Sequence, residues 1–170
     1  MIRVATLEEF DPKFMGSLCK VLYQAFAVGS EHAGQVIAPG GVGEPADPHK
    51  LLTGLPAVRA FADDRVLYLT VRKLAPRKLQ GAEVPTFGVS QYNGQRALVS
   101  ASHIKSVNDN VKVVARYALQ ELGHTWGVHH CLDPRCSMYP HWTPSYLTGD
   151  AIFCTFCREQ TDQKVSLAKS

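Results

Sequence analysis

The sequence predicts a mixed α/β (α+β) fold with a twisted sheet, a long helix late in the chain and a short cysteine-rich C-terminal segment. Strand-like and helix-like apolar patterns alternate along the first three quarters, and four of the five cysteines fall in the last quarter. The chain has 170 residues, of which 45% are hydrophobic and 19% are charged. This apolar content excludes disorder of the whole chain, and this length suits one domain with its own hydrophobic core. We therefore expect a single domain over 1–170, divided into a sheet-and-helix part (1–126) and a cysteine-rich part (127–170).

The first third of the chain reads as a strand followed by a helix. Residues 2–7 alternate like a strand, and Asp11-Pro12 supplies an N-cap and a first-turn proline. Apolar residues then follow at helical spacing as far as Phe26. Residues 29–48 are rich in glycine and proline, which predicts a long surface loop, and 49–62 predicts a second, weaker helix.

The middle of the chain predicts strands and a hairpin. Residues 65–71 are rich in Val, Leu, Tyr and Thr and predict a central strand, whereas 74–83 are basic and predict a solvated loop. Two strand-like runs, 86–92 and 95–101, flank Asn93-Gly94. This dipeptide favours a tight hairpin because both of its residues adopt positive φ readily.

A helical pattern returns near Asn108 and continues to Trp126. Asn108 or Asp109 can cap its start, and apolar residues form one stripe, at Val111, Val114, Ala115, Ala118 and Leu122. Gly127 follows the last helical residue, at the position where a left-handed conformation ends many helices.

The end of this helix carries a zinc-site pattern. The run QELGHTWGVHHC begins at Gln120 and matches H-E-x-x-H-x-x-G-x-x-H except at its first residue. Positions 120 and 124 lie one helical turn apart, so their side chains point to the same place, and Glu121 lies beside them to accept a proton from water. Gly127 lets the chain reverse so that His130 returns as a third ligand. Three ligands and one open position characterise catalytic zinc.

The cysteines divide into one isolated thiol and two pairs. Cys19 lies among apolar neighbours in the first helix and is interpreted as a buried, inert thiol. Cys131 and Cys136 form one pair, and Cys154 and Cys157 form the other. Together they offer four thiolates for a closed tetrahedral zinc site that would tether the C-terminal segment. A redox-active C-x-x-C is the competing interpretation.

These motifs resemble those of the archaemetzincins, a branch of the metzincin metalloproteases. The matching region covers about 120–157 and includes Met138, which corresponds to the methionine turn of metzincins. The resemblance implies a compact metzincin-like domain with one catalytic and one structural zinc, and hydrolysis of peptide bonds. It places the catalytic zinc on Gln120, His124 and His130, the general base on Glu121, and the structural zinc on the four paired cysteines.

Gln120 departs from the family pattern, which has histidine there. A neutral amide oxygen is a poor zinc ligand beside an imidazole, so we expect the catalytic zinc to bind weakly or not at all. Four side chains are weighed as replacements, each with a low expectation: His129, His141, Tyr139 and His103. The cysteine site does not depend on Gln120.

Three functions remain open from the sequence. The first is a zinc metallopeptidase, in which Glu121 activates zinc-bound water and the strand around 87–92 holds the peptide. The second is an inactive metzincin fold that serves as a binding module. The third, a zinc ribbon that binds nucleic acid, is disfavoured by the small net charge of +3 and its even spread. We expect a monomer with a peptide or protein substrate and no nucleic-acid or membrane partner. We also expect a cytoplasmic, unexported chain, because no signal-like or membrane-spanning run appears.

Overall fold

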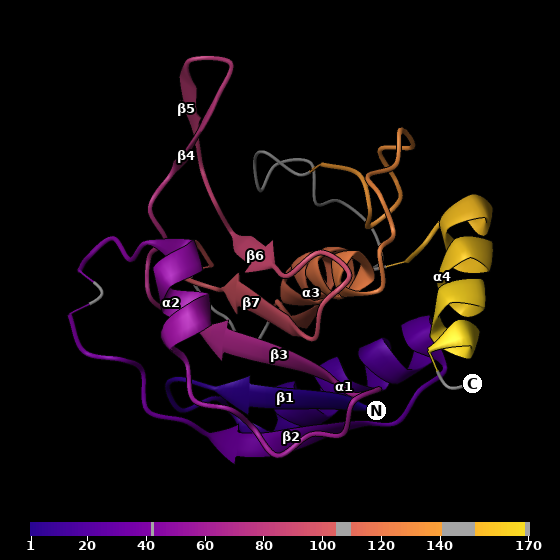
Figure 1. Cartoon of the computed structure of the whole chain (residues 1–170), viewed down its shortest axis with the longest axis horizontal. Helices are drawn as coiled ribbons and strands as arrows, with labels where there is room; N and C mark the ends of the chain where they lie inside the picture. Colours follow the sequence, from indigo (N-terminus) through magenta and orange to yellow (C-terminus); the bar gives the residue numbers. More distant parts are fainter. Residues whose placement is uncertain (42, 105–109, 141–151, 169–170) are drawn as a thin grey trace.

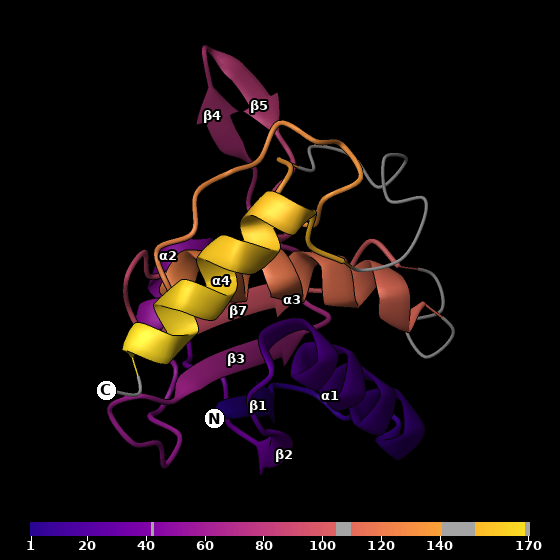
Figure 2. The same cartoon turned by 90° about the vertical axis from the view of Figure 1, so that its right-hand side faces the viewer.

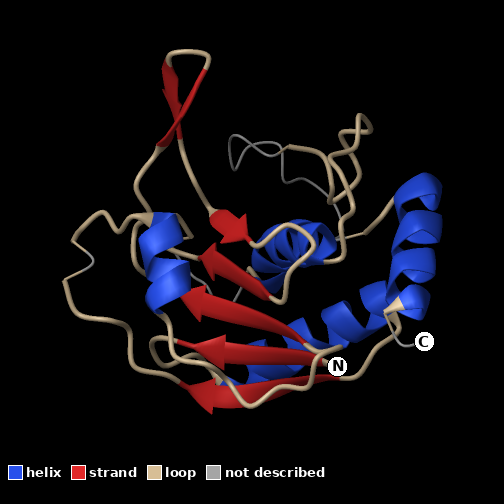
Figure 3. Cartoon of the chain, in the orientation of Figure 1, coloured by secondary structure: helices blue, strands red, loops and turns tan. Residues whose placement is uncertain are grey.

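A computed structural model describes residues 1–41, 43–104, 110–140 and 152–168. Its centre is a five-stranded sheet in the order β2-β1-β3-β7-β6 (Figures 1 and 3). These strands have the bounds β1 Ile2–Thr6, β2 Ser30–Gln35, β3 Arg65–Thr70, β6 Gly88–Ser90 and β7 Arg96–Ser100. The first four strands in this order run parallel, and β6 pairs antiparallel with β7 at one edge. The predicted mixed sheet and fold class are thereby confirmed.

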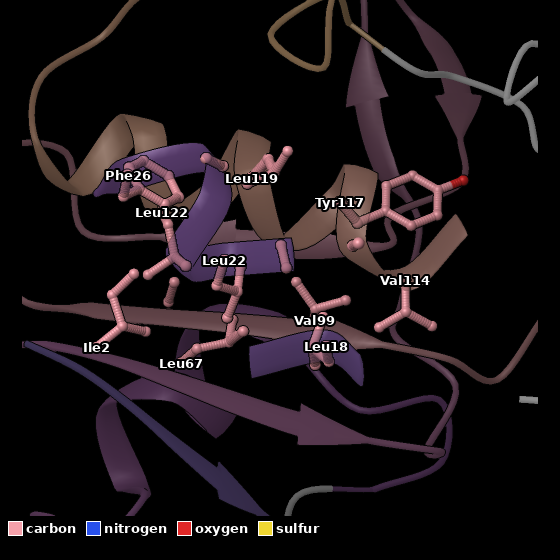
Figure 4. Close-up of a cluster of buried hydrophobic side chains, with 14 of the residues drawn as sticks. Ile2, Leu18, Leu22, Phe26, Leu67, Val99, Val114, Tyr117, Leu119 and Leu122 are labelled. Carbon is pink, nitrogen blue, oxygen red and sulfur yellow. The ribbon is translucent and has the colours of Figure 1, made fainter. Parts of the chain in front are cut away.

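Helices cover both faces of the sheet, which explains why its central strands are apolar on both sides. α1 (Pro12–Phe26) and α3 (Val111–Thr125) pack on one face, against alternate residues that include Val4, Leu67 and Val99 (Figure 4). The short helix α2 (Pro48–Gly54) packs on the other face, against residues such as Tyr68 and Leu98. α3 is therefore fixed along its length by buried side chains.

The predicted ends of α1 follow from its sequence. The Asp11 side chain accepts hydrogen bonds from the backbone N–H groups of Lys13 and Phe14, as expected of an N-cap. Ala27 ends the helix in the left-handed conformation, with φ of 51°. The aspartate and the proline after it therefore begin this helix where the sequence predicts.

Four sequence predictions need correction. The predicted loop 29–48 contains β2, and the predicted loop 74–83 contains a hairpin of β4 (Arg77–Leu79) and β5 (Ala82–Val84). The second helix ends at Gly54 rather than residue 62. The cysteine-rich segment contains a helix, α4 (Thr155–Leu167), that the sequence analysis did not predict. No residue of β2 or of the β4–β5 hairpin is fully buried, so neither carries the apolar alternation that identifies a strand.

The β6–β7 hairpin forms as predicted, although β6 has only three residues. Asn93 has a positive φ of 54°, whereas Gly94 does not. The turn therefore uses only one of the two left-handed positions that Asn-Gly allows. Its backbone is held by a bond from Gly94 N–H to Gln91 O of 2.9 Å.

α4 closes the fold against the C-terminal end of α1 (Figure 2). The Arg158 guanidinium on α4 donates to the carbonyls of Gln24 and Ala25, in the last turn of α1. A cation there is favoured by the helix dipole. Among the described residues, no helix has the length and apolar character that spanning a bilayer would require.

Candidate metal and active site

The C-terminal end of α3 is fixed by a glycine and a neighbouring hairpin. Gly127 has a φ of 75°, as its place after the helix predicts. The β6–β7 turn lies so close that any Cβ at position 127 would clash with the Asn93 side chain. Asn93 N–H also donates to the His124 carbonyl at 3.0 Å. The sheet edge and the end of the helix are therefore locked together where the motif residues lie.

His124 and His130 converge on one point. Their Nε2 atoms lie 3.2 Å apart, close to the spacing of about 3.3 Å for two nitrogens on one tetrahedral zinc. His124 Nδ1 lies 2.8 Å from the Val128 carbonyl, so this nitrogen carries the proton and Nε2 presents its lone pair. Desolvation and the nearby charges lower the pKa of His130 to about 4, so its ring is neutral at pH 7. This pair has the donor chemistry of a zinc site.

Glu121 is held by the edge strand of the sheet. Ser90 Oγ donates to Glu121 Oε2 at 2.7 Å. A Cβ on Gly88 would lie 2.7 Å from Glu121 Cγ, so only glycine leaves room for the carboxyl group there. Burial raises the pKa of Glu121 to about 7, while the Ser90 hydrogen bond and the charge of Arg77 lower it. A carboxyl group with this pKa can both accept and return a proton at neutral pH.

Gln120 is buried, with 7% of its surface exposed. Its Nε2 donates to the Tyr139 carbonyl at 3.3 Å, so the NH₂ group is engaged in a hydrogen bond and cannot bind a metal. Position 120 lines the same cleft as both histidines. The structure therefore brings Gln120 to the site but ties its amide group to the loop that contains Met138.

Three of the four side chains weighed as replacements for a histidine at position 120 lie in the described part of the chain, and none of them takes over that ligand position. His129 lies at the surface with Nε2 2.8 Å from the Tyr92 hydroxyl, and Tyr139 meets Gln120 through its backbone carbonyl. The His103 ring packs against Phe87 and edge-on against Tyr117, with ring centroids 4.2 and 5.3 Å away. His141 lies outside the described residues.

His103 makes a testable contribution to acid stability. Burial lowers its pKa to about 4, and neither ring nitrogen has a hydrogen-bond partner among the described residues. Between pH 6.5 and 4 the unfolded chain binds a proton that the folded chain does not, so stability falls as the pH falls through this window. Between pH 7 and pH 4.5, we expect the melting temperature of His103→Phe to fall by less than that of the parent chain. Parallel curves of melting temperature against pH for the two proteins would contradict this assignment.

The motif residues open into a cleft of about 460 Å³ between α3 and β6. Gln120, Glu121, His124 and His130 line its floor, and Phe87, Tyr92 and Tyr117 add aromatic surface. Arg77, at the start of the β4–β5 hairpin, also lines the cleft, and its charge acts on Glu121 and both histidines. In Figure 1 this hairpin projects above the sheet beside β6. The cleft is large enough for a short peptide segment.

The four paired cysteines form a compact cluster. Their sulfur atoms all lie within 4.8 Å of one another, and no disulfide joins them. Cys131 and Cys154 Sγ are 3.7 Å apart, close to the spacing of about 3.8 Å for two sulfurs on one tetrahedral zinc. The backbone N–H groups of Asp133, Met138, Cys154 and Cys157 donate to these sulfurs, which favours thiolates. This donor set fits zinc.

The methionine of the predicted turn lies directly beneath α3. Met138 is fully buried, and a Cβ on Gly123 would lie 2.6 Å from its sulfur atom. Cys131 N–H donates to the Met138 carbonyl at 2.9 Å. The methionine therefore packs between the histidine helix and the cysteine cluster.

The sequence predicts the strand around 87–92 as a peptide-binding element, but the roles of individual residues at the site were missed. Gly88 and Ser90 occupy alternate positions of one strand, so a small residue and a hydroxyl facing the same side were the available signal. Arg116 precedes Gln120 by one helical turn and thus shares its face, which was a second signal. Tyr92 and Arg77 carried no local signal, because their role depends on how distant segments pack.

One curated protein is similar to part of this chain in sequence. An archaemetzincin from Methanopyrus kandleri is 33% identical over 101 residues, which are 58% of this chain and 54% of that protein. The chain thus matches about half the length of this curated relative in sequence. No model of a protein family matches the chain.

Solved structures share the fold over almost the whole chain. The Methanopyrus kandleri archaemetzincin has a TM-score of 0.80 at 20% identity, covering 97% of this chain and 94% of that one. A zinc-dependent peptidase from Methanocorpusculum labreanum has a TM-score of 0.75 at 18% identity, covering 95% and 100%. An archaemetzincin from Archaeoglobus fulgidus, complexed with malonate, has a TM-score of 0.74 at 17% identity, covering 94% and 98%. The predicted resemblance to archaemetzincins is confirmed, and the chain has their fold.

Proposed function

We propose that this chain, which has the archaemetzincin fold, is a zinc-dependent metallopeptidase that hydrolyses peptide bonds in the cleft between α3 and β6. The observation that carries the proposal is the convergence of His124 and His130, with Nε2 atoms 3.2 Å apart, in the same cleft as Glu121. Relatives of the same fold include a zinc-dependent peptidase. The fold alone would not identify the reaction, so the proposal depends on the side chains of the site.

Two zinc ions are proposed, each held by the chain's own residues. His124 and His130 would hold the catalytic ion, and Cys131, Cys136, Cys154 and Cys157 would hold the structural one. When bound, the catalytic ion supplies a Lewis acid that polarises the scissile carbonyl and acidifies water. The cysteine site offers four protein ligands, so it leaves no open position and serves the fold.

Glu121 is proposed as the general base. Its carboxyl group has a pKa of about 7, raised by burial, so it can accept a proton from water and return it to the leaving amine. Ser90 and Gly88 fix the carboxyl group from the sheet side. Such positioning lowers the cost of orienting the base during the reaction.

The edge strand β6 is proposed to bind the substrate as an added strand. β6 is last in the sheet, and its neighbours Phe87 and Gln91 form backbone hydrogen bonds with β7. Since these bonds alternate along an antiparallel pair, the backbone groups of Gly88 and Ser90 turn away from β7. A peptide paired with them would lie beside Glu121, bound mainly through its own backbone. We therefore expect a peptide or protein substrate with little sequence preference.

Gln120 is proposed to weaken the catalytic zinc site. Its NH₂ group is occupied by the Tyr139 carbonyl, and its remaining oxygen is a neutral and weak zinc donor. This departure favours one alternative, an archaemetzincin fold that binds peptides without hydrolysing them. Location in a reducing cytoplasm and a monomeric state stay predictions from the sequence.

The test compares the parent chain with Glu121→Gln, assayed on unstructured peptides with zinc added to saturation. If Glu121 is the base, its replacement should lower the hydrolysis rate by about 10²–10⁴-fold while the zinc content stays unchanged. The matched control is Glu9→Gln, because Glu9 is an exposed carboxylate outside the cleft. A parent chain that binds peptides but cleaves none at saturating zinc would support the binding module instead. Equal cleavage by the parent and the Glu121→Gln variant would exclude Glu121 as the base.

A further inference from the structure

Arg116 is the largest fully buried side chain in the part of the chain that the structure describes, with 1% of its surface exposed. It lies on α3, one turn before Gln120. Burying a guanidinium, which keeps its charge at any ordinary pH, is unfavourable unless its surroundings compensate for the lost hydration. A buried arginine on the helix that carries the active site therefore requires a structural reason.

The guanidinium reaches the loop that joins the first two cysteines of the cluster. Its Nη2 donates to the Arg135 carbonyl at 3.2 Å and to the Pro134 carbonyl at 3.5 Å. Both carbonyls lie between Cys131 and Cys136, and the charge of the Cys136 thiolate acts on Arg116, raising its pKa against the larger lowering by burial. Arg116 thus connects α3 directly to one half of the four-thiol cluster.

The charge of this group matches the chemistry of the cluster. Four thiolates around one Zn²⁺ carry about two net negative charges. Two of these sulfurs, on Cys136 and Cys157, belong to buried residues, where water screens charge poorly. A fixed positive charge that interacts with Cys136 offsets part of this negative charge. Arginine suits this role better than lysine because its guanidinium stays charged when buried, whereas burial readily shifts the pKa of a lysine.

We propose that Arg116 is a positioning residue of the four-cysteine zinc site, which holds the Cys131–Cys136 loop against α3 and balances part of the charge of the thiolate–zinc group. The inference rests on the proposed structural zinc site. It also links the two metal sites, since His130 immediately precedes this loop and Met138 closely follows it. Groups that orient metal ligands from outside the ligand set typically contribute about 10–100-fold to metal affinity.

The experiment measures zinc affinity at the cysteine site of the full-length chain. The protein is loaded with Co²⁺, and the thiolate-to-cobalt absorption band, which only the cysteine site produces, is titrated away with Zn²⁺ against a competing chelator. Arg116→Met should lower zinc affinity at least about tenfold, and Arg116→Lys should fall between this variant and the parent. The matched control is Arg65→Met, because Arg65 also donates to two backbone carbonyls, those of Asp63 and Asp64, but contacts no cysteine.

The outcomes separate this inference from the proposed function. A parent chain without a thiolate–cobalt band would refute the structural zinc site itself. A normal band in the parent, with unchanged affinity in Arg116→Met or an equal loss in Arg65→Met, would overturn the role of Arg116 alone. If Arg116→Met does not fold, Arg116→Lys decides: a measurable loss of affinity supports the proposal, and parental affinity overturns it.

Discussion

Gln120→His should raise the affinity of the catalytic site for zinc at least about tenfold, since loss of even an outer partner of a zinc ligand typically costs about 10–100-fold. The replacement puts an imidazole nitrogen one helical turn from His124, on the face that already lines the cleft. It removes an amide whose NH₂ group is engaged by the Tyr139 carbonyl. The new site would have three nitrogen ligands and one open position, as catalytic zinc requires.

The measurement is bound zinc per chain after dialysis against a weak chelator, together with peptide cleavage by the same samples. The parent should retain one zinc, at the cysteines, and Gln120→His should retain two with faster cleavage. Gln120→Leu is the control, because it keeps a buried side chain but offers no donor atom. Two tightly held zinc ions in the parent would show that Gln120 does not weaken the site. Two ions in Gln120→His without any cleavage would favour the binding module.

The predictions that succeeded rest on local sequence signals. The stripe of apolar residues and the glycine after it placed the end of α3 within one residue, because helix periodicity and a left-handed C-terminal residue are both encoded nearby. The cysteine spacing predicted a cluster, and the structure brings the two cysteine pairs together although Cys136 and Cys154 are eighteen residues apart. Such a spacing is readable in a sequence because zinc ligation would require cysteine or histidine at fixed positions.

The elements that were missed are stabilised by contacts that leave no periodic apolar pattern. β2 has no fully buried residue and depends on its ladder with β1. α4 buries only Cys157, Thr161 and Val165, at intervals of four residues. The two cysteines at its start match a metal-binding pattern, which does not by itself indicate a helix. A narrow apolar face that includes a threonine is weak evidence for a helix.

The same distinction applies to the site. Glu121, His124 and His130 lie within ten residues of the chain, so their spacing alone was enough to predict them from the sequence. Ser90 and Gly88 contact Glu121 from about thirty residues earlier in the chain. Arg116 contacts the Cys131–Cys136 loop, which follows the turn after α3. These contacts arise from the packing of α3 on β6 and on the loop before Met138. Nothing in the local sequence specifies that packing.

Cys157→Ser should abolish tight zinc binding at the cysteine cluster and destabilise the fold. Cys157 is 1% exposed and begins the inward face of α4, so a lost ligand also weakens the contact of this helix with the core. Structural zinc contributes about 10–16 kcal/mol of binding free energy in zinc-finger peptides. Even a third of that would lower the melting temperature by roughly 6–20 °C, at about 2–4 °C per kcal/mol for a chain of this size.

Cys19→Ser provides the matched control, because Cys19 is a partly buried thiol in α1 outside the cluster. A typical point substitution costs about 1 kcal/mol, so its melting temperature should fall by only a few degrees. The decisive comparison adds a strong chelator: the parent and Cys19→Ser should both lose stability, whereas Cys157→Ser should respond little because its zinc is already absent. Equal melting temperatures for both serine variants, or a parent that ignores the chelator, would mean that the four thiols stabilise the fold by packing alone.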